Sequence, residues 1–173
     1  NKGFLTLEEA RDQAEYYDKY QEGVYRYKMK GKGETLVEHG KVLVEGVVCV
    51  SWHAKGVYKF RIKGKGYALI EDGEVLIEGV DWVDWYEEGV YKYEIEGEGR
   101  TLVEDGEVLV DGADWVYWHE KGVYEYEIKG KGCTLVEDGK VLVEGAEYAS
   151  WCAKGVYRYK MKGEDWVKVN NNK

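Results

Sequence analysis

Acidic residues at matching places in an internal repeat are the first candidates for chemistry. Asp81, Asp114 and Glu147 lie 33 residues apart, and Val48 stands at the same place one repeat earlier. On the inner face of a sheet, three carboxylates at one level could bind a metal ion or a cationic ligand. Buried carboxylates are costly without partners, and a bulge after the preceding glycine would turn this column to solvent instead. The sequence favours the bulge and predicts no metal site, but the three residues stay candidates for a ligand-binding lining.

Aromatic residues form the second set of candidates. They recur at two places in each repeat, where period-2 alternation puts them on one side of a strand. The predicted lining consists of Tyr27, Phe60, Tyr93, Tyr126, Trp52, Trp85, Trp118 and Trp151. A further column faces outward in this register and would turn inward if the bulge forms: Cys49, Trp82, Trp115 and Tyr148. The same bulge therefore decides the direction of both columns.

Catalytic groups do not fall into a recognisable set. His53 and His119 occupy equivalent places two repeats apart, and no Ser/His/Asp or Cys/His combination shares one predicted surface. The three cysteines lack metal-ligand spacing. The Gly-x-Gly pairs are expected in mid-strand, whereas a phosphate loop must precede a helix. We therefore expect no enzymatic activity, no cofactor and no bound metal.

A repeat of 33 residues positions all of these side chains. The tripeptide Gly-Val-Tyr begins at Gly23, Gly56, Gly89, Gly122 and Gly155. Each period reads as two strands of alternating character joined by an Asp-Gly pair, which favours a type I′ hairpin turn. Pairing Val103 with Val108 across one such turn keeps the recurring residues on one face. The eight expected strands cover about 24–38, 41–54, 57–71, 74–87, 90–104, 107–120, 123–137 and 140–153, and a ninth covers about 155–169.

The first 22 residues differ from the repeats. Thr6 and Glu9 have the spacing of a capping box, and an amphipathic helix is expected at about 6–20, with Gly23 as its stop. We divide the chain into a capping helix (1–22), a repeat region (23–169) and a polar tail (170–173). Because the connections are short and edges must be protected, we expect one all-β, antiparallel, up-and-down barrel with the helix at one mouth. The ninth strand should lie beside the eighth, and it could close the barrel, lie over it as an appendage or pair between chains.

Uniform strand lengths, Asp-Gly and Lys-Gly turns, glycine kinks and the lack of proline resemble idealised, de novo designed up-and-down β-barrels. Their topology is similar to that of lipocalins, although no lipocalin Gly-x-Trp signature follows the helix. The resemblance implies a non-catalytic scaffold with a possible interior cavity. A binding protein for a small apolar or aromatic ligand is the first alternative, and a self-assembling structural protein that uses unpaired strand edges is the second.

Charge and hydrophobicity limit the partners. The formal charge of −9 argues against nucleic-acid binding, which needs a cationic face. The sequence predicts neither a signal peptide nor a membrane-spanning helix, and it leaves the compartment open. No partner is required by these features, whereas a small hydrophobic ligand and self-association remain compatible with them.

Overall fold

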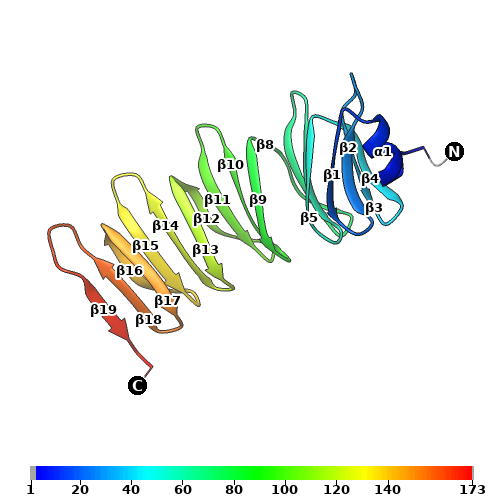
Figure 1. Ribbon diagram of the computed structural model, residues 1–173. Coiled ribbons are helices and arrows are strands. Elements are labelled where there is room, and N and C mark those ends of the chain that lie inside the picture. Colours follow the sequence, from blue (N-terminus) through cyan, green and yellow to red (C-terminus); the bar gives the residue numbers. More distant parts are fainter. Residues whose placement is uncertain (1–2, 173) are drawn as a thin grey trace. The chain divides into compact units, whose positions relative to one another are not determined.

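The computed structural model describes residues 3–172 and consists of antiparallel β-structure with one short helix (Figure 1). The helix is α1 (Leu7–Gln13). The first sheet contains β1 (Tyr16–Gln21), β2 (Val24–Lys28), β3 (Glu34–Glu38) and β4 (Lys41–Val47). The second contains β5 (Cys49–Ala54), β6 (Val57–Ile62), β7 (Gly66–Glu71) and β8 (Glu74–Val80). The third contains β9 (Trp82–Glu87), β10 (Val90–Ile95), β11 (Gly99–Glu104) and β12 (Glu107–Ala113). The fourth contains β13 (Trp115–Glu120), β14 (Val123–Ile128), β15 (Gly132–Glu137) and β16 (Lys140–Ala146). The fifth contains β17 (Tyr148–Ala153), β18 (Val156–Lys160) and β19 (Val167–Asn170).

The helix is shorter than its sequence pattern suggests. The predicted capping box is confirmed, because the Thr6 side chain accepts from the backbone N–H of Glu9 while the Glu9 carboxylate accepts from that of Thr6. The helix ends at Gln13 because Ala14 adopts an extended conformation. The expected continuation to residue 20 is wrong: residues 16–21 form β1, which pairs antiparallel with β2. Tyrosine-rich segments favour strands, and the edge of β2 offers this one a hydrogen-bonding partner.

The hairpin turns agree with the sequence. Asp105 has a φ of 49° and Gly106 a φ of 81°, and positive φ at both central residues defines the type I′ turn. His39 takes the place of the aspartate in the first repeat, with a φ of 47°. The expected pairing of Val103 with Val108 is confirmed across this turn.

Each long strand that the sequence predicts is two strands in the structure. The Gly-x-Gly segments are turns rather than mid-strand kinks: the backbone N–H of Lys32 donates to the carbonyl of Met29 at 3.0 Å, and equivalent bonds recur in the second, third and fourth repeats. Gly31 adopts a φ of 72°, and a Cβ on Gly33 would lie 2.5 Å from the Val47 carbonyl oxygen. Two glycines therefore allow a reversal and a close approach of two backbones that side chains would prevent.

Bulges divide the return strands. The pairing of β11 with β12 shifts register on both sides of Leu102, which lies opposite Val110, and the same shifts recur between β3 and β4 and between β15 and β16. A glycine with positive φ lies next to the last residue of each of these fourth strands: Gly46, Gly79, Gly112 and Gly145. The bulge left open in the sequence analysis is therefore present. Beyond that first pair, the register across the Asp-Gly turn is shifted: Val110 lies opposite Leu102, where an unbroken ladder from Val103 and Val108 would place Thr101.

The strands form five separate sheets, and none of them closes, so the expected barrel is not what the structure contains. The Gly-x-Gly turns and the bulged breaks confine each sheet to three or four short strands, which leaves no continuous sheet long enough to close. The pairing of the ninth segment with the eighth is confirmed, since β18 pairs with β17. Its second half forms β19 on the other side of β18.

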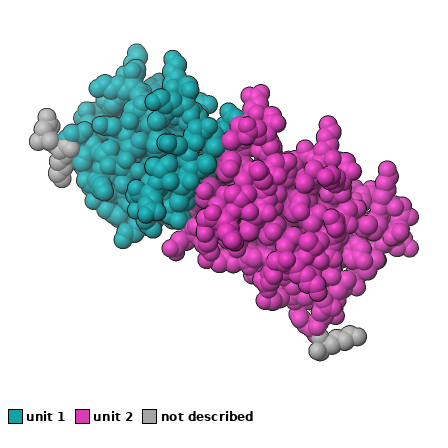
Figure 2. Space-filling model, turned by 180° about the vertical axis from the view of Figure 1, so that it is seen from behind, with its two compact units in different colours: residues 1–83 teal, residues 84–173 magenta. Residues whose placement is uncertain are grey.

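The chain divides into two compact units, one ending at Val83 and the other beginning at Asp84 (Figure 2). Within each unit, successive sheets pack face to face. A pair of aromatic residues on the second strand of one sheet packs against a leucine and a valine of the sheet before it: Tyr124 and Tyr126 pack with Leu102 and Val110. The leucines at the equivalent place of the third strand are fully buried in the first four sheets: Leu36, Leu69, Leu102 and Leu135. In the first sheet, α1 takes the place of a preceding sheet and covers the equivalent aromatic pair.

Candidate functional site

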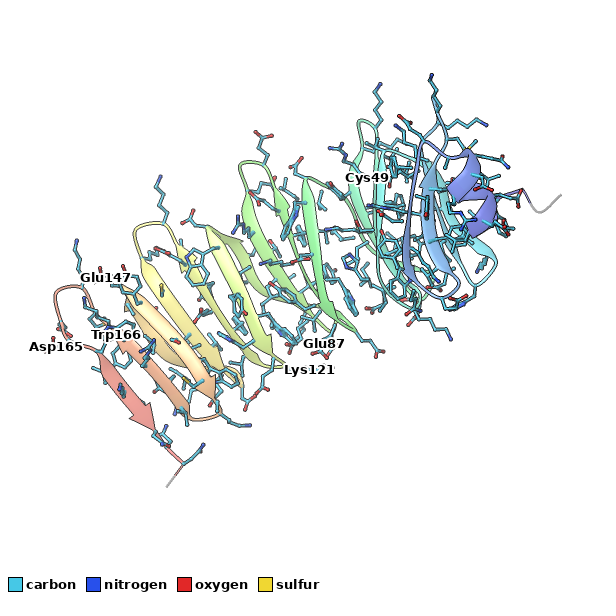
Figure 3. The ribbon with its side chains drawn as sticks, viewed as in Figure 1. Cys49, Glu87, Lys121, Glu147, Asp165 and Trp166 are labelled. Atoms are coloured by element: carbon cyan, nitrogen blue, oxygen red, sulfur yellow. The ribbon has the colours of Figure 1, made fainter. Side chains whose placement is uncertain are left out.

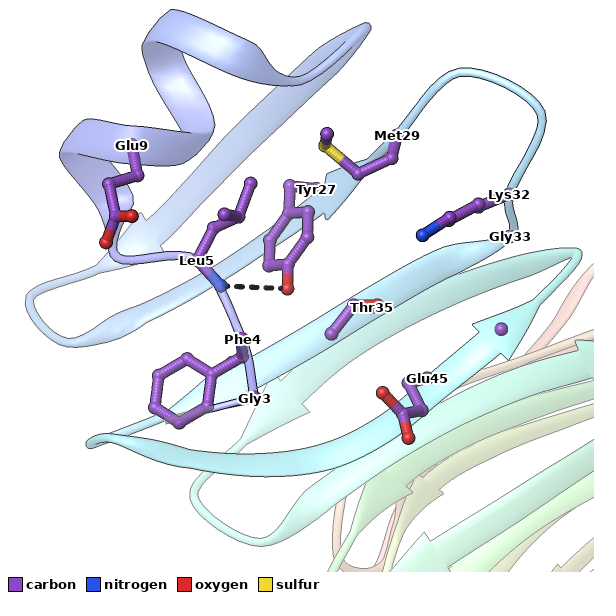
Figure 4. A pocket seen from close by; sticks show the side chains of 11 residues that line it. Gly3, Phe4, Leu5, Glu9, Tyr27, Met29, Lys32, Gly33, Thr35 and Glu45 are labelled. Atoms are coloured by element: carbon purple, nitrogen blue, oxygen red, sulfur yellow. Dashed lines mark hydrogen bonds between the residues drawn. The ribbon is translucent and has the colours of Figure 1, made fainter. Parts of the chain in front are cut away.

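A cavity of about 580 Å³ lies where the N-terminal segment crosses the first sheet (Figure 4). This volume is in the range of small-molecule sites. The N-terminal segment lines one side of this half-open hollow, and the turn after β2 and the end of β4 line the other. Its lining consists of Gly3, Phe4, Leu5, Glu9, Tyr27, Met29, Lys32, Gly33, Thr35, Glu45 and Gly46.

Two tyrosines of β2 hold the segment in place. The Tyr25 hydroxyl donates to the carbonyl of Leu5 at 2.6 Å, and the Tyr27 hydroxyl accepts from the backbone N–H of Leu5 at 3.1 Å. Both rings are buried, and they stack with centroids 6.3 Å apart. Burial raises the pKa of Tyr25, and the nearby Tyr27 and Glu9 raise it further. Both backbone groups of Leu5 are thus engaged, which fixes the roof of the cavity.

The lining combines apolar walls with charges at the rim. Phe4, Leu5 and Met29 supply apolar surface, and the exposed Glu45 and Lys32 supply one charge of each sign. Such a lining can bind a small ligand through contact with its walls and a polar interaction at its mouth. The equivalent place in the second sheet holds a smaller cavity of about 350 Å³ that Phe60 lines. A similar hollow therefore occurs in the first two sheets, and the N-terminal segment that lines one side of it is particular to the first sheet.

The predicted aromatic lining is divided among several layers. Tyr27 lines the cavity, and Phe60 stacks on Tyr58 between the first and second sheets. Tyr126 packs in the layer between the third and fourth sheets, and Tyr93 stacks on its neighbour Tyr91. Because the strands do not surround one interior, these residues do not converge on a common ligand site.

The tryptophans join neighbouring sheets through a recurring contact that the sequence reasoning missed. The Trp118 indole N–H donates to the carboxylate of Glu104, in the preceding sheet, at 2.9 Å. The same carboxylate accepts from the backbone N–H of Gly122 at 3.1 and 3.2 Å. We call this arrangement the Glu–Trp–Gly clamp. It recurs as Glu38 with Trp52 and Gly56, and as Glu137 with Trp151 and Gly155. Trp85, at the equivalent place of the third sheet, is partly buried.

The glutamate of the clamp could have been recognised in the sequence by its fixed spacing to the tryptophan. It ends the Leu-Val-Glu segment that comes directly before a hairpin turn, 14 residues before its tryptophan. Period-2 alternation assigns it to the polar side of a strand, and only the contact between two sheets reveals its acceptor role.

A second recurring contact joins the same layers: Arg26 donates to the carbonyl of Val50 at 2.6 Å, and Lys92 to that of Val116 at 3.3 Å.

The acidic column lies on the surface. Asp81, Asp114 and Glu147 are exposed and directly precede the first strands of three different sheets. Glu147 lies 3.9 Å from the Lys160 ammonium, and Figure 3 shows it beside the fifth sheet. The bulge turns this column outward, so the three carboxylates do not form a ring at one level. Within residues 3–172, no three His, Cys, Asp or Glu side chains gather as a set of metal ligands.

One buried carboxylate has no counterpart in the other repeats. Glu34 is 5% exposed and accepts from the backbone N–H of Val50 at 2.7 Å and from the Tyr16 hydroxyl. Arg26 lies 3.7 Å from it. Burial raises the pKa of Glu34, and the bond from Val50 offsets part of that rise.

In the part of the chain that the structure describes, no helix has the length and apolar character needed to cross a bilayer. Comparison with models of known families, with curated proteins and with solved structures finds no match.

Proposed function

We propose that this protein is a non-catalytic scaffold whose repeated sheets form rigid stacks. The observation that carries the proposal is the Glu–Trp–Gly clamp, which recurs with nearly constant geometry: the three indole-to-carboxylate distances are 2.6, 2.9 and 2.8 Å. A polar group that joins two sheets in the same way at three places in the chain serves assembly of the fold. The interlayer leucines and aromatic pairs support the same reading, since each layer reuses one packing arrangement.

If the layers are interchangeable, removal of one whole repeat leaves a folded protein. Deletion of residues 115–147 joins Asp114 to Tyr148 and removes β13 to β16. Glu104 would then meet Trp151 and Gly155 in place of Trp118 and Gly122. We expect the shortened chain to keep its β-sheet circular dichroism and a cooperative unfolding transition. A control removes residues 115–131, about half of one period, so that Asp114 is joined to Gly132 and the repeat is left out of phase; it should lose more stability if register matters. Loss of structure in the in-phase deletion would contradict the proposal.

The cavity under the N-terminal segment favours a second candidate function, the binding of a small apolar or aromatic ligand. The supporting observation is a half-open hollow of about 580 Å³ whose lining includes Phe4, Leu5, Tyr27 and Met29. The test is titration with an environment-sensitive dye. Met29→Trp should fill the cavity and abolish dye fluorescence, whereas Ile95→Trp, at the equivalent place in the third sheet, should leave it unchanged. Equal dye binding by both variants and the parent protein would rule out this cavity as the binding site.

A further inference from the structure

An ion pair recurs beside the first strands of two sheets. Glu15 directly precedes β1, and its backbone N–H donates to the carbonyl of Lys28 in β2 at 2.8 Å. Its carboxylate lies 3.4 Å from the Lys28 ammonium. In the fifth sheet, Glu147 and Lys160 repeat both contacts, at 2.8 and 3.9 Å. At this place, therefore, an acid before the first strand pairs with a cation of the second strand.

The second sheet keeps the backbone contact and lacks the acid. The N–H of Val48, directly before β5, donates to the carbonyl of Arg61 in β6 at 2.9 Å. Among residues 3–83, no carboxylate lies within ion-pair distance of Arg61 or of its neighbour Lys63. The Arg61 guanidinium lies 5.8 Å from the centroid of the Tyr67 ring, within the range of a cation–π interaction. Because Arg61 is exposed, its hydrogen-bond donors remain available to a ligand.

A half-open hollow lies beside this cation. Its volume is about 580 Å³, in the range of small-molecule sites, and it shares no lining residue with the cavity under the N-terminal segment. Val48 and Ile62 provide apolar surface, and each is 41% exposed. Two cations and one carboxylate belong to the same lining, which consists of Val48, Arg61, Ile62, Lys63, Gly64, Gly66 and Asp81.

We propose that this hollow binds a small monocarboxylate that carries an aromatic or branched aliphatic group. The carboxylate of the ligand pairs with Arg61, in the place that the side chains of Glu15 and Glu147 take in the first and fifth sheets. Its apolar group covers Val48 and Ile62. A guanidinium binds a carboxylate through two parallel hydrogen bonds, which a neutral amide does not reproduce. With two cations and one carboxylate, the lining has a net charge of +1, which matches a ligand with one negative charge.

The probe is naphthalene-2-carboxylate, titrated into the intact protein and followed by ¹⁵N–¹H NMR, which measures weak affinities and locates the site. The amides of Val48 and of residues 61–66 should shift. Two comparison compounds should each bind at least about tenfold more weakly: naphthalene-2-carboxamide, which has the same shape without the charge, and acetate, which lacks the apolar group. Arg61→Gln should weaken the binding of naphthalene-2-carboxylate about tenfold.

A second variant and two controls complete the test. Val48→Glu supplies the acid that the second sheet lacks, so it should pair with Arg61 and weaken binding about tenfold as well. Both replaced side chains are exposed, so the two variants should keep the parent circular dichroism. Lys160→Gln is the matched control, because this cation already pairs with Glu147, and it should leave the affinity unchanged. Met29→Trp, which fills the cavity under the N-terminal segment, should also leave it unchanged.

The proposal is overturned if naphthalene-2-carboxylate does not bind, if the carboxamide or acetate binds equally well, or if either Arg61→Gln or Val48→Glu leaves the affinity unaltered. Loss of binding in Met29→Trp would assign the probe to the cavity under the N-terminal segment and overturn it as well. Equal weakening in Lys160→Gln would show that any exposed cation suffices, with the same consequence.

Discussion

Removal of one clamp glutamate should reveal how much the contact between sheets contributes to stability. Glu104 accepts from the indole of Trp118, which is 9% exposed, and from the backbone N–H of Gly122. Glu104→Ala leaves both donors without this acceptor. A hydrogen bond to a charged group contributes about 1.5–3 kcal/mol, and water reaches the partly exposed Gly122 more easily than the indole, so we expect a loss of about 2–4 kcal/mol. For a chain of this size, that lowers the melting temperature by about 4–16 °C.

The assay is urea unfolding followed by circular dichroism, with Glu107→Ala as the matched control. Glu107 is exposed in the same hairpin, and its replacement should change the unfolding free energy by less than about 0.5 kcal/mol. A double-mutant cycle with Trp118→Phe isolates the contact itself, and we expect a coupling free energy of about 1–2 kcal/mol. Equal stability of Glu104→Ala and Glu107→Ala, or additive effects in the cycle, would refute the argument that the clamp joins the sheets.

Three further perturbations test other parts of the structure. Gly99→Ala should lower the free energy of unfolding by about 2–4 kcal/mol, since its Cβ would lie 2.9 Å from backbone atoms of β12. Gly97→Ala, also at positive φ but with nothing within 4 Å of the added Cβ, should lower it by only about 1–2 kcal/mol, and equal losses in urea unfolding would contradict this. Burial raises the pKa of Glu34 in the folded state, so the unfolding free energy of the parent, relative to that of Glu34→Gln, should fall as the pH rises from the ordinary pKa of 4.5 through the folded pKa, and should then stay constant. Urea unfolding at a series of pH values measures this difference, and a fall on acidification would contradict the prediction. Leu135→Lys should lower the free energy of unfolding by at least about 3 kcal/mol, because it buries a charge between the fourth and fifth sheets. Val141→Lys, at a side chain 52% exposed, should change it by less than about 0.5 kcal/mol, and similar thermal midpoints for the two variants would contradict the packing of Leu135 between sheets.

Local features of the chain were predictable because neighbouring residues determine them. The capping box needs only Thr6 and Glu9, and the type I′ turns need only a residue that tolerates positive φ followed by glycine. The period of 33 residues and the antiparallel hairpins follow in the same way. Of the candidate site residues, Tyr27 lines the hollow beside the N-terminal segment rather than the interior of a barrel.

Features that depend on distant backbone were not predictable in this way. Alternation continues unbroken through Gly31 and Gly33, so the sequence reads as one strand where the chain actually reverses. The helix prediction failed at Tyr16 and Tyr17 because pairing with β2 outweighed the helical spacing of the apolar residues. The acceptor role of Glu104 depends on a second sheet that no local pattern describes.

The sequence by itself determined the repeat, the antiparallel hairpins and their type I′ turns, since periodicity and turn chemistry act over a few residues. Only the tertiary structure decided between one closed sheet and five separate ones. The physical reason is seen in the first sheet. The close backbone approach at Gly33 and the bulge at Gly46 end this sheet, and its apolar face is buried against the second sheet.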